Sequence, residues 1–186
     1  MNAHRDHHEQ ESAWRAGDGA EGDEVGGDML KGAIAGAVGV WVMDRVDWYM
    51  FDHEDPEARR RTEAVRPGGL DPAHRAAGQV ARALGTELSP AQPHPAGIAV
   101  HYALGVAPGA LYGALRDRVP GVGAGRGLLW GLGLFALEDE IMNPVAGLAA
   151  KPGEYPWQAH ARGLVAHLVY GFVTDLAFGA LKARSR

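Results

Sequence analysis

The chain has 186 residues, 46% of them hydrophobic and 22% charged, and a formal net charge of −5 at pH 7. This length suits a single domain, and nothing in the charge pattern indicates nucleic-acid binding. Because the sequence contains no cysteine, disulfides and thiolate sites are excluded.

The first 28 residues form an acidic, polar segment. They lack the order of a cleaved signal peptide, in which basic residues precede an apolar run. Low hydrophobicity with many like charges is typical of disordered chain. We therefore predict a disordered tail over residues 1–28, whose acids are Asp6, Glu9, Glu11, Asp18, Glu21, Asp23, Glu24 and Asp28.

Four apolar segments follow, at about residues 29–51, 96–115, 127–149 and 163–181. Each has about the 20 residues that a helix needs to cross a hydrocarbon core. Glycine and alanine recur at spacings of four, as they do in helices that pack closely in lipid. These features predict an all-α membrane domain over residues 29–186. We favour a four-transmembrane-helix bundle over a soluble helical bundle.

A shorter helix is predicted between the first two apolar segments, at about residues 71–88. Asp71 followed by Pro72 is a typical helix start. Apolar residues then form a stripe along one face of the segment. We expect this helix to lie on the membrane surface or to cap the bundle, with Arg75 and Arg82 meeting lipid headgroups.

Two of the apolar segments share a pattern of histidine and glycine. The sequence "HPAGIAVHYALGVAPGALYGALR" at 94–116 aligns with "HARGLVAHLVYGFVTDLAFGALK" at 160–182 at a constant offset of 66. The first and third segments correspond less sharply, but an acid in the first segment aligns with an acid in the third. This repeat predicts two helical hairpins related by an axis along the membrane normal. The matched pairs are His94/His160, Gly97/Gly163, His101/His167, Gly105/Gly171, Gly113/Gly179 and Arg116/Lys182.

The repeat places histidines and acids at one depth, about 10 Å from the loop-side helix ends at 1.5 Å rise per residue. A charged side chain in lipid costs roughly 2.5 to 3.5 kcal/mol, so these groups should face the bundle interior and pair there. We predict a metal site formed by His101, His167, Asp44, Glu138 and Asp139, with Glu138 or Asp139 facing inward. The predicted entrance to it is lined by Asp47, His94, His160 and Glu140, with Glu140 near the mouth or paired with Arg45.

Three interpretations of this layer remain open. Imidazole and carboxylate groups suit a divalent transition metal and also titrate together near neutral pH, which favours transport or sensing of protons or divalent cations. Alternatively, His101 and His167 would hold haem b, because the glycines four residues either side of each leave room for a flat macrocycle. In the third interpretation the layer only fixes packing in a structural or assembly protein. No Ser-His-Asp or Cys-His arrangement is present, so no catalytic residue is predicted and a non-enzyme is favoured.

The chain resembles the YagU-like family of bacterial inner-membrane proteins, a domain family without an assigned biochemical function. The resemblance rests on "YPWQAHARGLVAHLVYGFVTDL" at 155–176, on "HYALGVAPGALYGALRDRVPG" at 101–121 and more faintly on "GAIAGAVGVWVMDRVDW" at 32–48. It implies a helical protein of the inner membrane and carries over no catalytic residue. Cations close to the helix ends favour cytoplasmic termini. The expected partners are the lipid bilayer and, through small-residue faces, a second copy of the chain.

Overall fold

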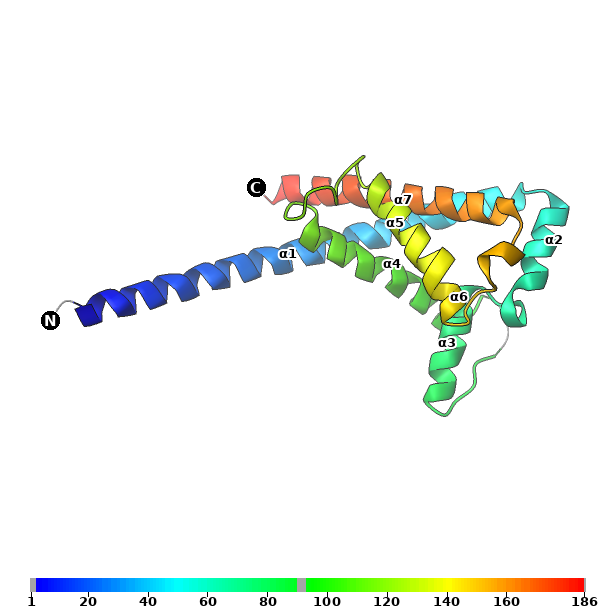
Figure 1. Ribbon diagram of the computed structural model, residues 1–186, viewed down its shortest axis with the longest axis horizontal. Coiled ribbons are helices and arrows are strands. Elements are labelled where there is room, and N and C mark those ends of the chain that lie inside the picture. Colours follow the sequence, from blue (N-terminus) through cyan, green and yellow to red (C-terminus); the bar gives the residue numbers. More distant parts are fainter. Residues whose placement is uncertain (1–2, 90–92, 186) are drawn as a thin grey trace.

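The computed structural model describes residues 3–89 and 93–185, with side chains described from residue 22 onward. This part of the chain is helical and contains no strand, as the sequence predicted. Three long helices, α1 (Ala3–Asp52), α4 (Pro95–Leu115) and α7 (Trp157–Arg184), form most of the body. The shorter helices α2 (Pro56–Val65), α3 (Pro72–Ala83) and α6 (Asn143–Val145) gather at the end of the body opposite the chain termini (Figure 1).

Helix α1 packs along both α4 and α7. Its contact with α4 is made through glycine. A Cβ atom added to Gly32 would lie 2.3 Å from the carbonyl oxygen of Gly109, and one added to Gly36 would lie 2.7 Å from that of Gly105. The two backbones approach this closely only because no side chain lies between them.

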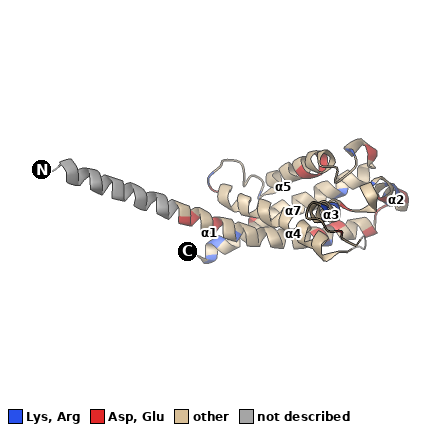
Figure 2. Cartoon of the chain, turned by 90° about the horizontal axis from the view of Figure 1, so that it is seen from below, with Lys and Arg blue, Asp and Glu red and all other residues tan. Residues whose placement is uncertain are grey.

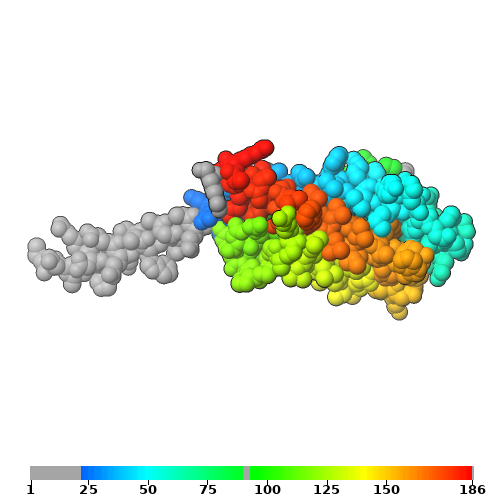
Figure 3. All heavy atoms as spheres, turned by 90° about the horizontal axis from the view of Figure 1, so that it is seen from above, coloured from blue at the N-terminus to red at the C-terminus, as the bar shows by residue number. Residues whose placement is uncertain are grey.

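Helix α5 (Leu128–Leu134) packs against α7, also through glycine. A Cβ atom added to Gly131 would lie 2.2 Å from the carbonyl oxygen of His167. Helix α5 continues into a π-helix, η2 (Phe135–Met142), and then into α6 (Asn143–Val145). The helix predicted at 127–149 therefore contains a wide π segment and ends at Val145. Figure 3 shows α7, in orange and red, lying between the α1–α2 region in blue and cyan and the α5–η2 region in green and yellow.

The end opposite the termini is formed by α2 (Pro56–Val65), η1 (Pro67–Gly69), α3 (Pro72–Ala83) and η3 (Pro152–Glu154). Asp55 and Asp71 cap the first turns of α2 and α3, and each precedes a proline. The sequence prediction missed α2 although it starts like α3. Helix α3 ends before the predicted residue 88, because Gly85 turns the chain with a φ of 76°.

The acidic N-terminal segment is part of α1, which begins at Ala3. The disordered tail predicted for residues 1–28 stays a prediction. Alanine and glutamate in this stretch favour helix, whereas its five glycines disfavour it. Asp28, the last residue of the predicted tail, is buried, with 2% of its surface exposed. The segment therefore merges with the first apolar helix instead of ending at residue 28.

Large apolar side chains cover the outside of the helical body. Three helical stretches in the described part of the chain, Gly22–Asp52, Pro95–Leu115 and Trp157–Arg184, are long and apolar enough to cross a membrane. Segment 127–149, the fourth predicted span, is not among them. Charged residues lie mostly toward the two ends of the body (Figure 2). This surface suggests a membrane protein; its most exposed members include Leu30, Ile34, Trp41, Trp48, Tyr49, Leu111, Leu129, Ile141, Val145 and Trp157.

Candidate functional site

The first histidine–carboxylate pair joins α4 to α1. Nε2 of His101 lies 2.7 Å from Oδ1 of Asp44, and the ring donates because a carboxylate only accepts. Gly105, one turn beyond His101, makes this contact possible. Its missing side chain is replaced by that of Val40, which lies one turn before Asp44. The contact of Gly105 with Val40 and the pair of His101 with Asp44 thus lie one turn apart along the same antiparallel helix pair.

The second pair joins α7 to the π-helix. Nδ1 of His167 donates to the carbonyl oxygen of Gly163 at 2.9 Å and lies 3.6 Å from Oδ2 of Asp139. Its Nε2 lies 4.0 Å from Oε2 of Glu138. The sequence predicted one inward acid, yet both reach His167. We attribute this to η2, because the wider π turn brings successive side chains closer to one face than an α-helix does.

The two pairs are neighbours. The carboxylate of Glu138 interacts electrostatically with His101 as well as with His167. However, no group of three or more His, Asp or Glu residues in the described chain is arranged to hold a metal ion. The predicted ligands therefore meet in two places, His101 with Asp44 and His167 with Glu138 and Asp139. Their geometry gives no support to a metal site.

A buried arginine occupies part of the predicted entrance. Arg162 is 9% exposed and donates through Nη1 to both carboxylate oxygens of Asp47, at 2.8 and 3.0 Å. Its Nε lies 3.3 Å from Oε2 of Glu54. Sequence reasoning did not single out Arg162 as a site residue. Its partners, Asp47 on α1 and Glu54 just beyond the end of α1, could not be read from the pattern.

The two outer histidines lie in different surroundings. Nδ1 of His160 lies 2.6 Å from Oε1 of Glu140, and its Nε2 lies 2.9 Å from the carbonyl oxygen of Pro152. Both neighbours, a carboxylate and a backbone carbonyl, are hydrogen-bond acceptors. Glu140 thus pairs with His160, and among the described residues it forms no ion pair with Arg45.

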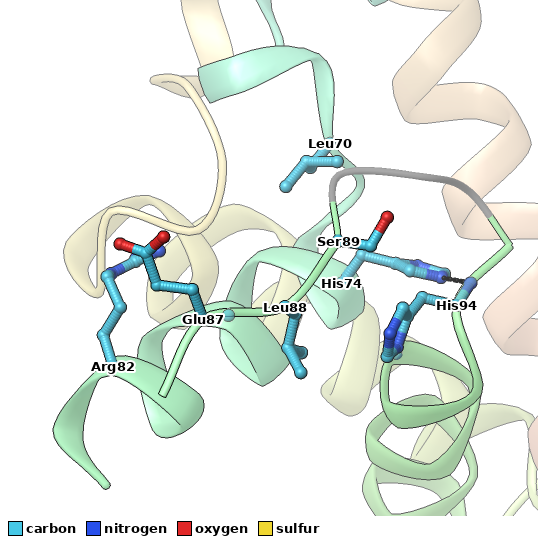
Figure 4. Close-up of a pocket in the computed structure, with 9 residues that line it drawn as sticks. Leu70, His74, Arg82, Glu87, Leu88, Ser89 and His94 are labelled. Carbon is cyan, nitrogen blue, oxygen red and sulfur yellow. Dashed lines mark hydrogen bonds between the residues drawn. The ribbon is translucent and has the colours of Figure 1, made fainter. Parts of the chain in front are cut away.

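His94 does not join His160. It caps α4, its Nδ1 accepting from the N–H of Ala96, and its own N–H donates to Nε2 of His74 on α3 at 2.9 Å. Figure 4 shows both histidines at a cavity of about 280 Å³. His101 and His167 are not among the residues that line this cavity: Leu70, His74, Gly78, Arg82, Glu87, Leu88, Ser89, His94 and Gly97.

The glycines beside His101 and His167 leave no slot for a haem. The Gly97 position is covered by the ring of His74, and that of Gly105 by Val40 and Tyr170. Gly163 faces Phe135 and Asp139, and Gly171 faces the backbone of Gly127 and Gly131. These glycines bring helices together, so their packing does not fit a macrocycle.

A second polar cluster lies where α1, α4 and α7 come together near the chain termini. Oδ1 of Asp175 accepts from the hydroxyl of Tyr112 at 2.6 Å and from Nε of Arg116 at 3.0 Å. Nζ of Lys182 donates to Asp117 at 2.7 Å and to the buried Asp28 at 3.2 Å, and Arg118 also donates to Asp28. We call Asp28, Tyr112, Arg116, Asp117, Arg118, Asp175 and Lys182 the terminal cluster.

The sequence singled out none of these residues as a site. Asp175 stands out as the one acid in the apolar run at 163–181, and that signal could have led to the terminal cluster. Hydrogen bonds from Lys182 and Arg116 lower the pKa of Asp117 below its usual value.

The chain matches no protein-family model, no curated protein and no solved structure. The function proposed below is therefore argued from the sequence and the geometry alone.

Proposed function

We propose that this chain is an integral membrane protein that handles protons, by transport or sensing, through its two histidine–carboxylate pairs. In this proposal the segment at 127–149 completes a four-helix bundle of two related hairpins, one formed by α1 and α4 and the other by α5–η2 and α7. The protein would lie in a bacterial inner membrane, in keeping with the resemblance to the YagU-like family.

The observation that carries the proposal is the pairing of an imidazole with acid in each hairpin, His101 with Asp44 and His167 with Glu138 and Asp139. Ionisable groups within membrane segments are expensive, and they commonly mark proton or ion pathways. Imidazole exchanges its proton near neutral pH. The 4.0 Å gap between His167 and Glu138 is short enough for one small rearrangement to complete a hydrogen bond.

Protons are favoured over the other two ligands considered, a divalent metal ion and haem b. Among the described residues no three ligands converge on a metal position, and the glycines beside the histidines are occupied by helix packing. A proton needs neither a coordination shell nor a cavity, only neighbouring donors and acceptors.

The test is proton flux in vesicles that contain the purified protein and a trapped pH indicator. After a pH step, the wild type should dissipate the gradient faster than empty vesicles, and His101→Asn and His167→Asn should return the rate toward that of empty vesicles. His53→Asn is the matched control, because His53 contacts only its own helix end, through Tyr49. Wild-type vesicles that leak no faster than empty ones across pH 5 to 8 would contradict transport, and the absence of any pH-dependent spectral change would contradict sensing.

A structural or assembly role is the second candidate, because buried polar contacts tie the helices together at both ends of the body. Arg162 joins α7 to α1, and Asp175 joins α7 to α4. Under this role the histidine variants would lower thermal stability in detergent without changing proton movement.

A further inference from the structure

The outward face of α1 carries one charged side chain among apolar ones. Between residues 29 and 51 its exposed positions are Met29, Leu30, Ile34, Val38, Trp41, Arg45, Trp48 and Tyr49. Arg45 lies about 10 Å along the helix from its end at Asp52. If α1 crosses a bilayer, as proposed above, this guanidinium faces lipid near the loop-side headgroups.

Two indole rings hold the guanidinium. The Cζ atom of Arg45 lies 4.8 Å from the ring centroid of Trp41 and 5.3 Å from that of Trp48. Tryptophan favours the membrane–water interface, where its N–H can reach polar headgroups. The rings restrict the guanidinium without neutralising it, because cation–π attraction supplies no negative charge.

No carboxylate within the described ranges lies within ion-pair distance of Arg45. The neighbouring acids are already engaged, Asp44 with His101 and Asp47 with Arg162. The buried Arg162, by contrast, has two carboxylate partners. A guanidinium against lipid without a protein counter-ion requires an anion from its surroundings.

We infer that Trp41, Arg45 and Trp48 form a binding site for the phosphate of an anionic phospholipid in the leaflet on the loop side. The planar guanidinium can donate two parallel hydrogen bonds to a phosphodiester, which a lysine cannot. Net charge favours an anionic lipid over a zwitterionic one. This inference rests on the proposed membrane location but not on proton handling.

The test measures quenching of tryptophan fluorescence by brominated lipid. Full-length chain with Trp14, Trp130 and Trp157 changed to phenylalanine is placed in phosphatidylcholine vesicles containing equal fractions of brominated phosphatidylglycerol or brominated phosphatidylcholine. We expect apparent association to be about five-fold stronger for phosphatidylglycerol. Arg45→Gln should abolish this preference, Arg45→Lys should keep part of it, and Lys31→Gln should keep all of it, since Lys31 lies far along α1 beside Asp28.

Equal quenching by the two lipids, or a preference that survives in Arg45→Gln, would overturn the inference. Loss of the preference on adding excess inorganic phosphate would also overturn it, in favour of a soluble phosphate site. A change of oligomeric state in Arg45→Gln with unchanged lipid preference would assign the face to a second copy instead. Carbonate extraction of the vesicles separates the proposed membrane location from the proposed lipid site. A chain that carbonate extracts refutes the membrane location. A chain that stays in the vesicles but shows no lipid preference refutes only the lipid site.

Discussion

Single glycines set the distance between the long helices. Gly36 has the Cα of Gly109 and the hydroxyl of Tyr170 within 3.2 Å of where its Cβ would be, whereas Gly133 on α5 has nothing within 4 Å. The same residue type therefore has opposite roles in the two places. A methyl group added at Gly36 would have to displace the backbone of α4. A methyl group added at Gly133 has free space, and it reduces the conformational freedom of the unfolded chain.

Gly36→Ala should destabilise the folded protein by about 1 to 3 kcal/mol through overpacking. Gly133→Ala should be neutral or stabilise it by up to about 1 kcal/mol. Unfolding in mixed micelles measures both. A Gly36→Ala variant as stable as wild type would show that α1 and α4 can separate at little cost.

Arg162 is a buried charge with two carboxylate partners. Replacing it with methionine leaves the buried Glu54 and the partly buried Asp47 without their partner. We expect Arg162→Met to lose about 3 to 5 kcal/mol of stability. Arg59→Met, which breaks the exposed ion pair with Glu63 and removes the guanidinium from the ring of Phe51, should lose about 1 kcal/mol or less. Equal losses in the two variants would contradict this assignment.

At the scale of elements, the π-helix η2 directs three consecutive acids toward α7. A π segment commonly reflects one residue more than an α-helix needs. Deleting the exposed Ala136 should restore α-helical turns and rotate Glu138 and Asp139 away from His167, by about 100° for a one-residue shift. Helix content by circular dichroism should stay unchanged while proton flux falls. Full flux in the deletion variant would show that only one acid beside His167 is needed.

The ends of α4 and α7 are held by Asp117 in the terminal cluster. Its pKa is lowered chiefly by the hydrogen bond from Lys182, so the folded state holds the proton less tightly than the unfolded state. The stabilisation is therefore fully present above the ordinary value of 3.8 and is lost as pH falls through the lower folded value. Melting in detergent should show Asp117→Asn less stable than wild type at pH 6, with the difference closing below about pH 3.

At the scale of the whole molecule, the sequence predicted the long helices well because apolar length and small-residue spacing are local properties. It also predicted that His101 and His167 each meet an acid, since the repeat fixes their depth. It missed the partners of Arg162 and the terminal cluster. Those contacts depend on how helices far apart in sequence are rotated against one another, which a pattern along one segment does not specify.

The proposed orientation places both termini in the cytoplasm. The chain lacks cysteine, so single cysteines report their own side of the membrane. In intact cells, an impermeant maleimide should label Gly153→Cys, on the exposed loop side, and should not label Ser185→Cys until the membrane is opened. The reverse pattern would invert the orientation and assign the Arg45 site to the inner leaflet.

Helix α3 links α4 to the segment that follows α6, at the end of the body opposite the termini. Nε of Arg75 donates to the carbonyl oxygen of Gly147 at 2.5 Å, and the side chain of Gln79 donates to that of Ala146 at 3.4 Å, while the other flank of α3 packs on α4. Arg75 thus donates to backbone carbonyls of two other segments of the protein, and its predicted contact with lipid headgroups stays a prediction. The terminal cluster joins α1, α4 and α7 near the other end of the body, so side-chain contacts link the helices at both ends. Rotation of side chains within a stiff frame, more than tilting of helices, is then the motion by which such a molecule would pass a proton from one group to the next.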